Sequence, residues 1–367
     1  MHIIYDDIIY SLQKSGGGSV YWTEIIRRNK RQAEHYAYDS AKDNFFYDEE
    51  NLPNLHIWSS LFLIAKRYFN VRFRHKNEPF IFHSSLYRLC KNKNAVNITT
   101  VHDFVYEYYR KDLKSILHKM QKKKAVLHSD GVICISENTK KDLLKFYPNF
   151  RGKIKVIYNG YSTDKYFYKP QIEKTRNVLF VGARTDYKRF DIAVSLIKAM
   201  PDCRLMIIGG GDLTETERGF LESNLPCRYE KKGYVPDEEL CDLYNAAFFL
   251  CYPSEYEGFG IPMIEAQACG CPVVCSPKSS IPEVTDGAAV YIDSEALDAS
   301  LENVNRLFDV SFYRAMQQRG LQNVKRFSWD VCADKVTQFY DEVFSQAVMG
   351  GGYNCKVISE RAVNYAA

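Results

Sequence analysis

No apolar run in the sequence approaches the roughly 20 residues that a membrane-spanning helix requires. Residues Met1–Tyr10 pass directly into a strand-like run, so we expect no signal peptide there. The sequence also has no internal repeat and no low-complexity segment. Its apolar content of 46% and charged content of 26% are ordinary for a globular protein, and we expect a cytoplasmic one.

Pairs of cysteines at C-x-x-C spacing are absent as well, although the chain contains 11 Cys. Cys269, Cys271 and Cys275 lie close together, but in an apolar stretch with no His nearby. A zinc site needs ligand pairs at turn spacing. We therefore expect no metal site, and we interpret the cysteines as buried, reduced thiols of a cytosolic protein.

Charge is unevenly distributed along the chain. Of the 49 basic and 45 acidic residues, 28 and 17 lie in residues 1–165, which gives this half a net charge of +11 and the remainder −7. With a length of 367 residues, the change of sign predicts two domains with different partners. The positive half should prefer an anionic partner: a lipid phosphate, a membrane face or a polyanion.

Short apolar and β-branched runs alternate with helical segments along the chain. Near-continuous apolar runs of this length are typical of parallel strands that are buried on both faces. The alternation predicts a doubly wound α/β protein. The predicted strands are His2–Tyr5, Phe80–His83, Val96–Val101, Gly131–Ile135, Ile154–Tyr158, Asn177–Val181, Arg204–Ile208, Phe248–Tyr252, Pro272–Cys275 and Ala288–Ile292.

A polar stretch without periodicity, Tyr161–Arg176, separates two series of these strands. We interpret it as a linker, which places the first domain at residues 1–165 and the second at residues 166–327. Helical periodicity continues over Phe327–Phe344, but its spacing does not indicate which domain this helix joins.

The segment Pro253–Ser276 is the most informative part of the chain. A predicted strand ends at Tyr252, a glycine-bearing loop follows, and Pro262 suits the first turn of a helix that ends at Gly270. The loop therefore lies at the carboxyl end of a strand and against a helix N-terminus. The free N–H groups and partial positive charge of such an end can hold a phosphate.

Two carboxylates flank this loop, Glu257 before it and Glu265 in the helix. A carboxylate repels a phosphate, so beside a phosphate it is useful as an acceptor for the hydroxyls of a sugar or a ribose. A favourable contact of Glu257 with the helix dipole and a solvated position for Glu265 explain the residues equally well. From residue chemistry alone, both interpretations stay open.

The string EGFGIPMIEAQACGCPVV closely resembles the E-x7-E signature of family 4 retaining glycosyltransferases, because seven residues separate Glu257 from Glu265. The resemblance implies a GT-B fold, in which two Rossmann-like doubly wound parallel-sheet domains face each other across a cleft. The C-terminal helix, about residues 328–367, would pack back on the first domain. The resemblance also implies that Glu257 holds hydroxyls of the donor sugar and that Glu265 holds the ribose. Backbone N–H groups for the sugar and phosphate would come from Gly258, Phe259 and Gly260.

The segment VGARTDYKRF resembles the part of this family that binds the diphosphate. Arg184 and Lys188 stand where the family has its Arg and Lys, although their spacing is one residue shorter than the commoner form and Arg189 is a rival. Cations aimed at a leaving diphosphate stabilise charge that grows in the transition state. Two solvated surface cations are the alternative.

Three further segments resemble parts of this family: a glycine-rich segment, a segment with a histidine, and Gly233-Tyr234-Val235, which resembles the segment that meets the nucleotide base. The segment KSGGGSVY resembles the glycine-rich loop over the donor phosphates, and TTVHDFVYE resembles the segment with a histidine near the donor sugar. A plain turn and a structural histidine are the alternatives. Ile207–Asp212 does not make the fingerprint of a dinucleotide-binding dehydrogenase. The candidates from these matches are Gly17, Gly18, Ser19 and His102, supported by Asp103, and Tyr234 and Val235 beside the nucleotide base.

The segment Arg110–Lys124 contains seven basic residues and one Asp, and its apolar residues form one stripe at helical spacing. Either this helix packs on its own domain with a solvated basic face, or it meets an anionic membrane surface. Members of the family that glycosylate lipid-linked sugars often carry such a feature. The stripe consists of Leu113, Ile116, Leu117 and Met120.

The resemblance implies a metal-independent, retaining hexosyltransferase that needs no cofactor, with Glu257, His102, Arg184 and Lys188 as its catalytic residues. Its partners would be a nucleotide-diphosphate sugar and a glycan or lipid-linked acceptor of surface polysaccharide biosynthesis at the inner face of the membrane, and no nucleic acid. The ARTDYKRF form resembles bacterial O-antigen and capsule mannosyltransferases, which favours GDP-mannose over a UDP sugar. An epimerase or hydrolase of the same fold and a catalytically silent sensing or assembly subunit are the alternatives.

Overall fold

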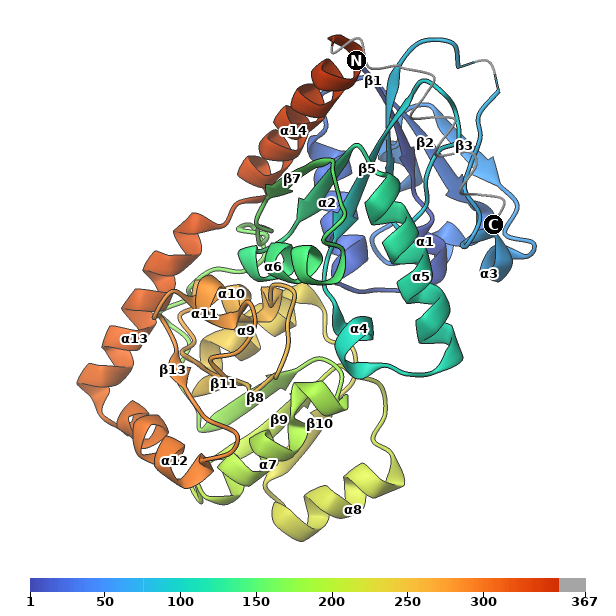
Figure 1. The fold of residues 1–367 in the computed structure, drawn as a ribbon. Helices are drawn as coiled ribbons and strands as arrows, with labels where there is room; N and C mark the ends of the chain where they lie inside the picture. Colours follow the sequence, from blue (N-terminus) through green and yellow to red (C-terminus); the bar gives the residue numbers. More distant parts are fainter. Residues whose placement is uncertain (75, 350–367) are drawn as a thin grey trace. The chain divides into compact units, whose positions relative to one another are not determined.

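The computed structural model describes residues 1–74 and 76–349, and the chain divides into two compact units (Figure 1). Unit 1 is formed by residues 1–159 together with helix α14 (Trp329–Met349), and unit 2 by residues 160–328. The division falls a few residues before the boundary at 165/166 that the sequence suggested. Of the C-terminal segment expected to be helical, residues 350–367 lie outside the described residues.

Unit 1 contains a seven-stranded parallel sheet with the order β3-β2-β1-β4-β5-β6-β7. Its central strands are buried on both faces; Ile3, Ile4 and Tyr5 of β1, for example, are fully buried. The strands are β1 (His2–Asp6), β2 (Ala33–Tyr38), β3 (Leu55–Trp58), β4 (Phe80–Ser84), β5 (Ala95–Val101), β6 (Gly131–Cys134) and β7 (Lys153–Val156). The helices are α1 (Ile9–Leu12), α2 (Gly17–Arg28), α3 (Leu63–Lys66), α4 (Val105–Tyr109), α5 (Leu113–His128), α6 (Glu137–Phe146) and α14, with the 3-10 turns η1 (Asp39–Asp43) and η2 (Glu49–Asn51).

Helix α14 belongs to unit 1, although the whole of unit 2 precedes it in the sequence. It packs against α2, β4 and β5. Tyr340 and Phe339 are buried in this contact, and the Tyr340 hydroxyl lies 2.6 Å from Nδ1 of His83. A Cβ on Gly131 of β6 would come within 2.9 Å of Phe339, so the approach of α14 to the sheet depends on a glycine there.

Unit 2 contains a six-stranded parallel sheet with the order β10-β9-β8-β11-β12-β13. The strands are β8 (Asn177–Val181), β9 (Arg204–Ile208), β10 (Tyr229–Lys232), β11 (Phe249–Tyr252), β12 (Val273–Cys275) and β13 (Val290–Tyr291). The helices are α7 (Phe190–Lys198), α8 (Glu215–Asn224), α9 (Asp237–Ala246), α10 (Ile261–Ala268), α11 (Ile281–Thr285), α12 (Leu297–Asn305) and α13 (Val310–Asn323), with the 3-10 turns η3 (Asp186–Lys188), η4 (Arg306–Phe308) and η5 (Val324–Arg326).

Both units are therefore doubly wound α/β structures of the Rossmann type, as the alternation of strands and helices predicted. Residues 161–176, expected to be a linker, contain no helix or strand; Tyr166 holds this stretch to α9 through Asp237, at 2.8 Å. None of the helices in the described parts of the chain combines the length and the apolar character of a membrane-spanning helix.

Candidate active site

In each sheet the strand order reverses once, between β1 and β4 in unit 1 and between β8 and β11 in unit 2. Doubly wound proteins bind ligands outside the carboxyl ends of the strands at this reversal. In unit 2, the segments that follow these two strands are η3 and the loop before α10. They carry Lys188 and Glu257, so the two residues predicted from separate motifs lie at one edge of one sheet.

An ion pair joins these two segments. Nζ of Lys188 lies 2.5 Å from Oε1 of Glu257 and 3.2 Å from the hydroxyl of Tyr252. The side chains of Lys188 and Glu257 are only 15% and 11% exposed. Burial lowers the pKa of Lys188, but the Glu257 carboxylate and Tyr252 raise it more, so that it lies above its usual value. The pair therefore places a fully charged ammonium beside a carboxylate that can accept hydrogen bonds from hydroxyl groups.

Serine hydroxyls hold the main chain of Glu257 on both sides. Its N–H donates to Oγ of Ser279 at 2.8 Å, and Oγ of Ser280 donates to its carbonyl at 2.9 Å. At the end of the loop, Gly260 has φ 97°, and a Cβ there would come within 2.4 Å of Met263. Only glycine fits this position, so the backbone itself fixes the entry into α10.

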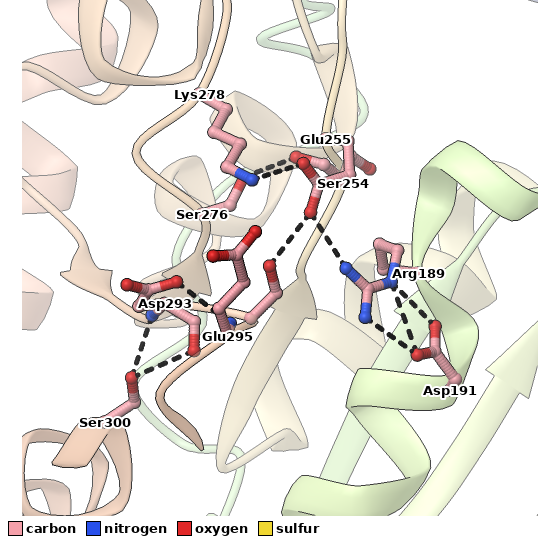
Figure 2. Close-up of polar contacts among 10 residues, drawn as sticks. Arg189, Asp191, Ser254, Glu255, Ser276, Lys278, Asp293, Glu295 and Ser300 are labelled. Atoms are coloured by element: carbon pink, nitrogen blue, oxygen red, sulfur yellow. Dashed lines mark hydrogen bonds and ion pairs between the residues drawn. The ribbon is translucent and has the colours of Figure 1, made fainter. Parts of the chain in front are cut away.

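Glu255, two residues before Glu257, ties several segments together (Figure 2). Its carboxylate accepts a hydrogen bond from Nη1 of Arg189 at 3.0 Å, and its own N–H donates to the carbonyl of Tyr187 at 2.7 Å. Tyr187 and Arg189 are the neighbours of Lys188 in the chain. These contacts therefore fix the turn that carries Lys188 to the loop that carries Glu257. Further donors to Glu255 are Lys278 and Ser294.

Arg189 is the alternative to Lys188 as a diphosphate-binding residue, but its side chain pairs with other residues. It has a left-handed backbone conformation, with φ 49°, at the start of α7. Its guanidinium group pairs with Asp191 at 2.9 Å as well as with Glu255. In this arrangement Arg189 stabilises the turn.

Arg184 is held by the turn between β9 and α8 and by α8 itself. Its Nε donates to Glu217 at 2.7 Å, and its Nη2 donates to the carbonyl of Asp212 at 2.8 Å. The side chain is only 3% exposed. Glu217 in turn completes the capping box of α8 with Thr214. Arg184 could contact a diphosphate only if its side chain left these partners. Lys188, in contrast, already lies beside Glu257 at the candidate site.

Glu265 lies one turn into α10, half-buried, with the Tyr244 hydroxyl 3.5 Å from its Oε2. Burial and the nearby Asp237 raise its pKa to about 8, although Tyr244 and Lys165 act in the opposite direction. Tyr234, expected beside a nucleotide base, is 68% exposed and precedes α9. The adjacent Val235 is buried.

In unit 1 the glycine-rich segment forms the beginning of α2. Gly17 is exposed, and a Cβ on it would meet no atom within 4 Å. Gly18 lies against Gln13 and Ile9. Ser19 is fully buried, and its Oγ accepts hydrogen bonds from the side-chain amides of Gln13, at 2.5 Å, and Asn44, at 2.9 Å. The hydroxyl of Ser19 therefore has structural partners, and the open position is Gly17.

His102 follows β5, at the carboxyl edge of the unit 1 sheet. Its ring packs edge-on against Tyr21, with 5.0 Å between the ring centres. Burial lowers its pKa to about 4; Asp103 opposes this shift and Lys122 adds to it. The imidazole is therefore neutral at physiological pH. Asp103 caps the turn that follows by accepting the N–H of Val105 at 3.0 Å.

Several supporting residues gave no signal in the sequence. Ser279, Ser280 and Glu217 position the predicted residues across 22 to 33 positions of chain, and Glu255 contacts Arg189 across 66 positions. The buried Lys122 similarly donates to the carbonyl of Asp103 at 2.9 Å. Hydrogen bonds between distant loops leave no periodicity or short motif to detect.

The ten cysteines in the described residues are free thiols, and all of them except Cys227 are buried. Cys269 lies beside Cys241 of α9, with 3.7 Å between the sulfur atoms. Within residues 1–74 and 76–349, no group of three or more His, Cys, Asp or Glu side chains is placed to hold a metal ion.

Comparison with known protein families assigns both halves of the chain. Residues 15–165 match the family described as "Glycosyltransferase Family 4". Residues 162–322 match the family described as "Glycosyl transferases group 1". The two matches together span residues 15–322, which include most of unit 2 and most of the part of unit 1 that precedes it.

Among curated proteins, the chain is 46% identical over 109 residues to O-antigen chain mannosyltransferase B of Escherichia coli, which is 29% of each chain. It is 30% identical to the O-antigen chain mannosyltransferase RfbU of Salmonella typhimurium, over 57% of this chain and 61% of the relative. The chain thus spans less than two thirds of these two relatives. An uncharacterized glycosyltransferase of Methanocaldococcus jannaschii is 25% identical over 89% of this chain and 95% of its own length.

Among solved structures, the sucrose-phosphate synthase of Thermosynechococcus elongatus superposes with a TM-score of 0.72 at 19% identity, over 94% of this chain and 99% of the synthase. HepE of Anabaena, solved in complex with UDP-glucose, gives a TM-score of 0.70 at 14% identity, over 93% of this chain and 100% of that structure. At these identities the likeness establishes the fold. Sequence families and fold agree, and the chain belongs to the GT-B glycosyltransferases, with a family 4 domain followed by a group 1 domain.

Proposed function

We propose that the protein is a retaining hexosyltransferase of surface polysaccharide biosynthesis. It transfers a hexose from a nucleotide-diphosphate sugar to a glycan or lipid-linked acceptor. The observation that carries this proposal is the pair of Lys188 and Glu257 at the reversal point of the unit 2 sheet. The ammonium of Lys188 can bind the diphosphate of the donor, and the carboxylate of Glu257 can accept hydrogen bonds from the hydroxyls of its sugar. The pair can therefore bind both ends of one donor.

In the proposed reaction, the acceptor oxygen bonds to the anomeric carbon on the face from which the diphosphate leaves. The bond between that carbon and the diphosphate oxygen breaks, and the departing diphosphate takes the hydroxyl proton. Lys188 and the amides that open α10 stabilise the charge that grows on the diphosphate. Glu257 orients the sugar, and Glu265 holds the ribose. Arg184 supports the site through the β9–α8 turn, and neither a metal nor a cofactor takes part.

GDP-mannose is the proposed donor, because relatives from Escherichia coli and Salmonella typhimurium are named O-antigen chain mannosyltransferases. UDP-glucose is the alternative, because HepE was solved with it. A thermal-shift panel of GDP and UDP sugars separates them. A bound donor at about 100 times its dissociation constant stabilises the protein by about 2.7 kcal/mol.

The Glu257→Gln variant tests the site. It keeps a hydrogen-bond acceptor for Lys188 but removes the charge that orients the sugar hydroxyls, so we expect an intact fold and loss of transfer by about a hundredfold or more. Transfer is measured as release of the nucleoside diphosphate with an extracted lipid-linked glycan as acceptor. The exposed Glu238→Gln is the matched control. Near-normal turnover of Glu257→Gln contradicts the assignment, and donor binding without any transfer by the unmodified chain would favour a silent sensing subunit.

A further inference from the structure

Unit 1 contains a cavity of about 520 Å³ between the end of α2 and the strands β2 and β3, which form one edge of its sheet (Figure 1). We call it the α2–β2 cavity. Ligand sites in proteins commonly have volumes of about 300–1,000 Å³, so this cavity can hold a small molecule. Its lining comes from α2, from the connection between α2 and β2, from β2 and from the turn before β3: Ile26, Arg27, Asn29, Arg31, His35 and Pro53.

The cavity lies toward the amino end of the sheet, away from the predicted site residues of unit 1. Arg31 precedes β2 and Pro53 precedes β3, and both strands run parallel to β1. A helix that connects two parallel strands starts at the carboxyl side of the sheet and ends at its amino side. Arg27 accordingly follows Gly17 by ten residues in α2, which is about 15 Å along the helix axis. A ligand in this cavity therefore occupies a place of its own.

The charged side chains of the described lining are basic, and no Asp or Glu belongs to it. Each arginine has five N–H donors, of which one is engaged by a carboxylate outside the lining. Arg27 donates to Asp48 at 3.4 Å, and Arg31 donates to Asp341 of α14 at 2.9 Å. Both pairs are exposed to solvent, where an ion pair contributes little to stability. The other N–H groups can therefore bind an anion without the loss of a strong contact.

A buried pair fixes His35 in the wall of the cavity. Nδ1 of His35 lies 2.9 Å from Oδ2 of Asp7, and the other oxygen of Asp7 accepts the indole N–H of Trp22 at 2.6 Å. The side chains of His35 and Asp7 are at most 1% exposed. Within residues 1–74 and 76–349, Nε2 of His35 makes no hydrogen bond. This nitrogen is therefore the polar atom that His35 offers to a ligand.

Two guanidinium groups and an imidazole suit a phosphate group, because guanidinium N–H groups match the spacing of phosphate oxygens. A phosphate ion alone would leave most of the cavity to solvent. Ile26 and Pro53 supply apolar surface for a carbon skeleton attached to the phosphate.

We propose that the α2–β2 cavity binds the phosphate group of a small phosphorylated compound, at a site separate from the candidate active site. Arg27 and Arg31 bind the phosphate, and His35 binds another polar group of the same ligand. Arg31 also contacts α14 through Asp341, so the bound ligand stabilises several segments of unit 1 together. This site does not depend on the proposed transferase activity.

The full chain with the substitution Lys188→Gln tests the cavity, because this change weakens phosphate binding at the candidate active site. We expect glucose 6-phosphate to raise the melting temperature and to give a calorimetric binding signal, and glucose to do neither at the same ionic strength. Equal affinity for inorganic phosphate would identify the free ion as the ligand, and tighter binding of glucose 6-phosphate a phosphate ester. Because Lys188→Gln leaves Glu257 unpaired, the unmodified chain with excess GDP and UDP serves as a second background.

Two matched pairs of substitutions decide the outcome. Arg27→Gln with Arg31→Gln should weaken binding of glucose 6-phosphate by about tenfold or more, with little change in the melting temperature of the free protein. Arg28→Gln with Lys30→Gln removes the same charge from the same segment, but neither residue lines the cavity, so binding should persist. The proposal is overturned if neither phosphate probe binds in either background. It is also overturned if the two double variants bind glucose 6-phosphate equally well.

Discussion

Lys188 and Glu257 stand close enough that each sets the electrostatic state of the other. The buried ammonium keeps its charge because the carboxylate lies 2.5 Å away. Removing one member of such a pair leaves an uncompensated buried charge. Effects of single substitutions here therefore combine a loss of stability with a loss of chemistry, and the two have to be measured separately.

Glu265 provides a test that depends on pH alone. Its pKa of about 8 in the folded chain lies above the ordinary value of 4.5, so the folded state binds more protons than the unfolded state between these limits. The contribution of Glu265 to stability is therefore full below about pH 4.5 and is lost as the pH rises through 8. Glu265→Gln should gain stability relative to the unmodified chain as the pH rises from 4.5 to 8.5, as urea denaturation at both pH values would show. A difference that stays constant with pH would contradict the raised pKa.

Substitutions of Arg184 and Lys188 should have different effects when stability and diphosphate binding are both measured. Arg184→Ala breaks the contacts with Glu217 and the β9–α8 turn and should cost about 2–4 kcal/mol of unfolding free energy, with donor affinity changed only a few-fold. Lys188→Gln should weaken binding of the nucleoside diphosphate by about ten- to a hundredfold. Urea midpoints and calorimetric titration with GDP or UDP give both quantities. If the Arg184→Ala chain folds normally but no longer binds GDP or UDP, Arg184 is itself a diphosphate-binding residue.

Among the elements, strands with a mainly apolar sequence were predictable, including β7 and β13 at sheet edges, and strands with a more polar sequence were not. The ten predicted strands all correspond to strands of the structure, but β2, β3 and β10 were missed. Strands β3 and β10 lie at sheet edges and have the sequences LHIW and YEKK, in which one face or both remain polar. Strand β2 lies inside the sheet, but Glu34 and His35 interrupt its apolar run.

The candidate site was predictable where a residue belongs to a short motif, and not where it depends on a distant partner. Glu257 and Lys188 come from separate motifs and meet in the structure. The engagement of Arg184 by Glu217, 33 residues away, could not be read from either motif. Helical spacing likewise identified the stripe of α5, but spacing alone cannot tell which face of a helix meets the protein.

The first turn of α2 offers a prediction at the scale of one element. Gly17 is the first residue of the helix, and Gly17→Ala places a methyl group in open space there, so it should raise stability by about 0.4–1 kcal/mol because alanine has less freedom in the unfolded chain. If the donor phosphates approach this turn closely, the same methyl group should weaken donor binding several-fold. Thermal melting and calorimetric titration with the donor would measure the two effects. Greater stability with unchanged donor affinity would show that Gly17 does not lie against the donor.

At the scale of the molecule, unit 1 needs the end of the chain. Helix α14 buries Trp329, Phe339, Tyr340 and Val343, which makes it part of the core. A chain that stops at Ser328 should lose the cooperative unfolding of unit 1, because large apolar surfaces on α2, β4 and β5 are uncovered. Limited proteolysis with mass spectrometry should then leave a protected fragment within residues 160–328. A truncated chain that resists proteolysis throughout would show that α14 is dispensable.

The return of α14 to unit 1 also sets an order of events during synthesis. Strand β7 ends at residue 156 and α14 ends at residue 349, so the ribosome must add almost two hundred residues before unit 1 is complete. At roughly 5–20 residues per second, this takes on the order of 10–40 seconds. During that time the continuous unit 2 can fold by itself, while the nascent unit 1 exposes the surface that α14 later covers. The half of the protein that is translated first is thus the half that is finished last, and it is the half on which chaperones should act.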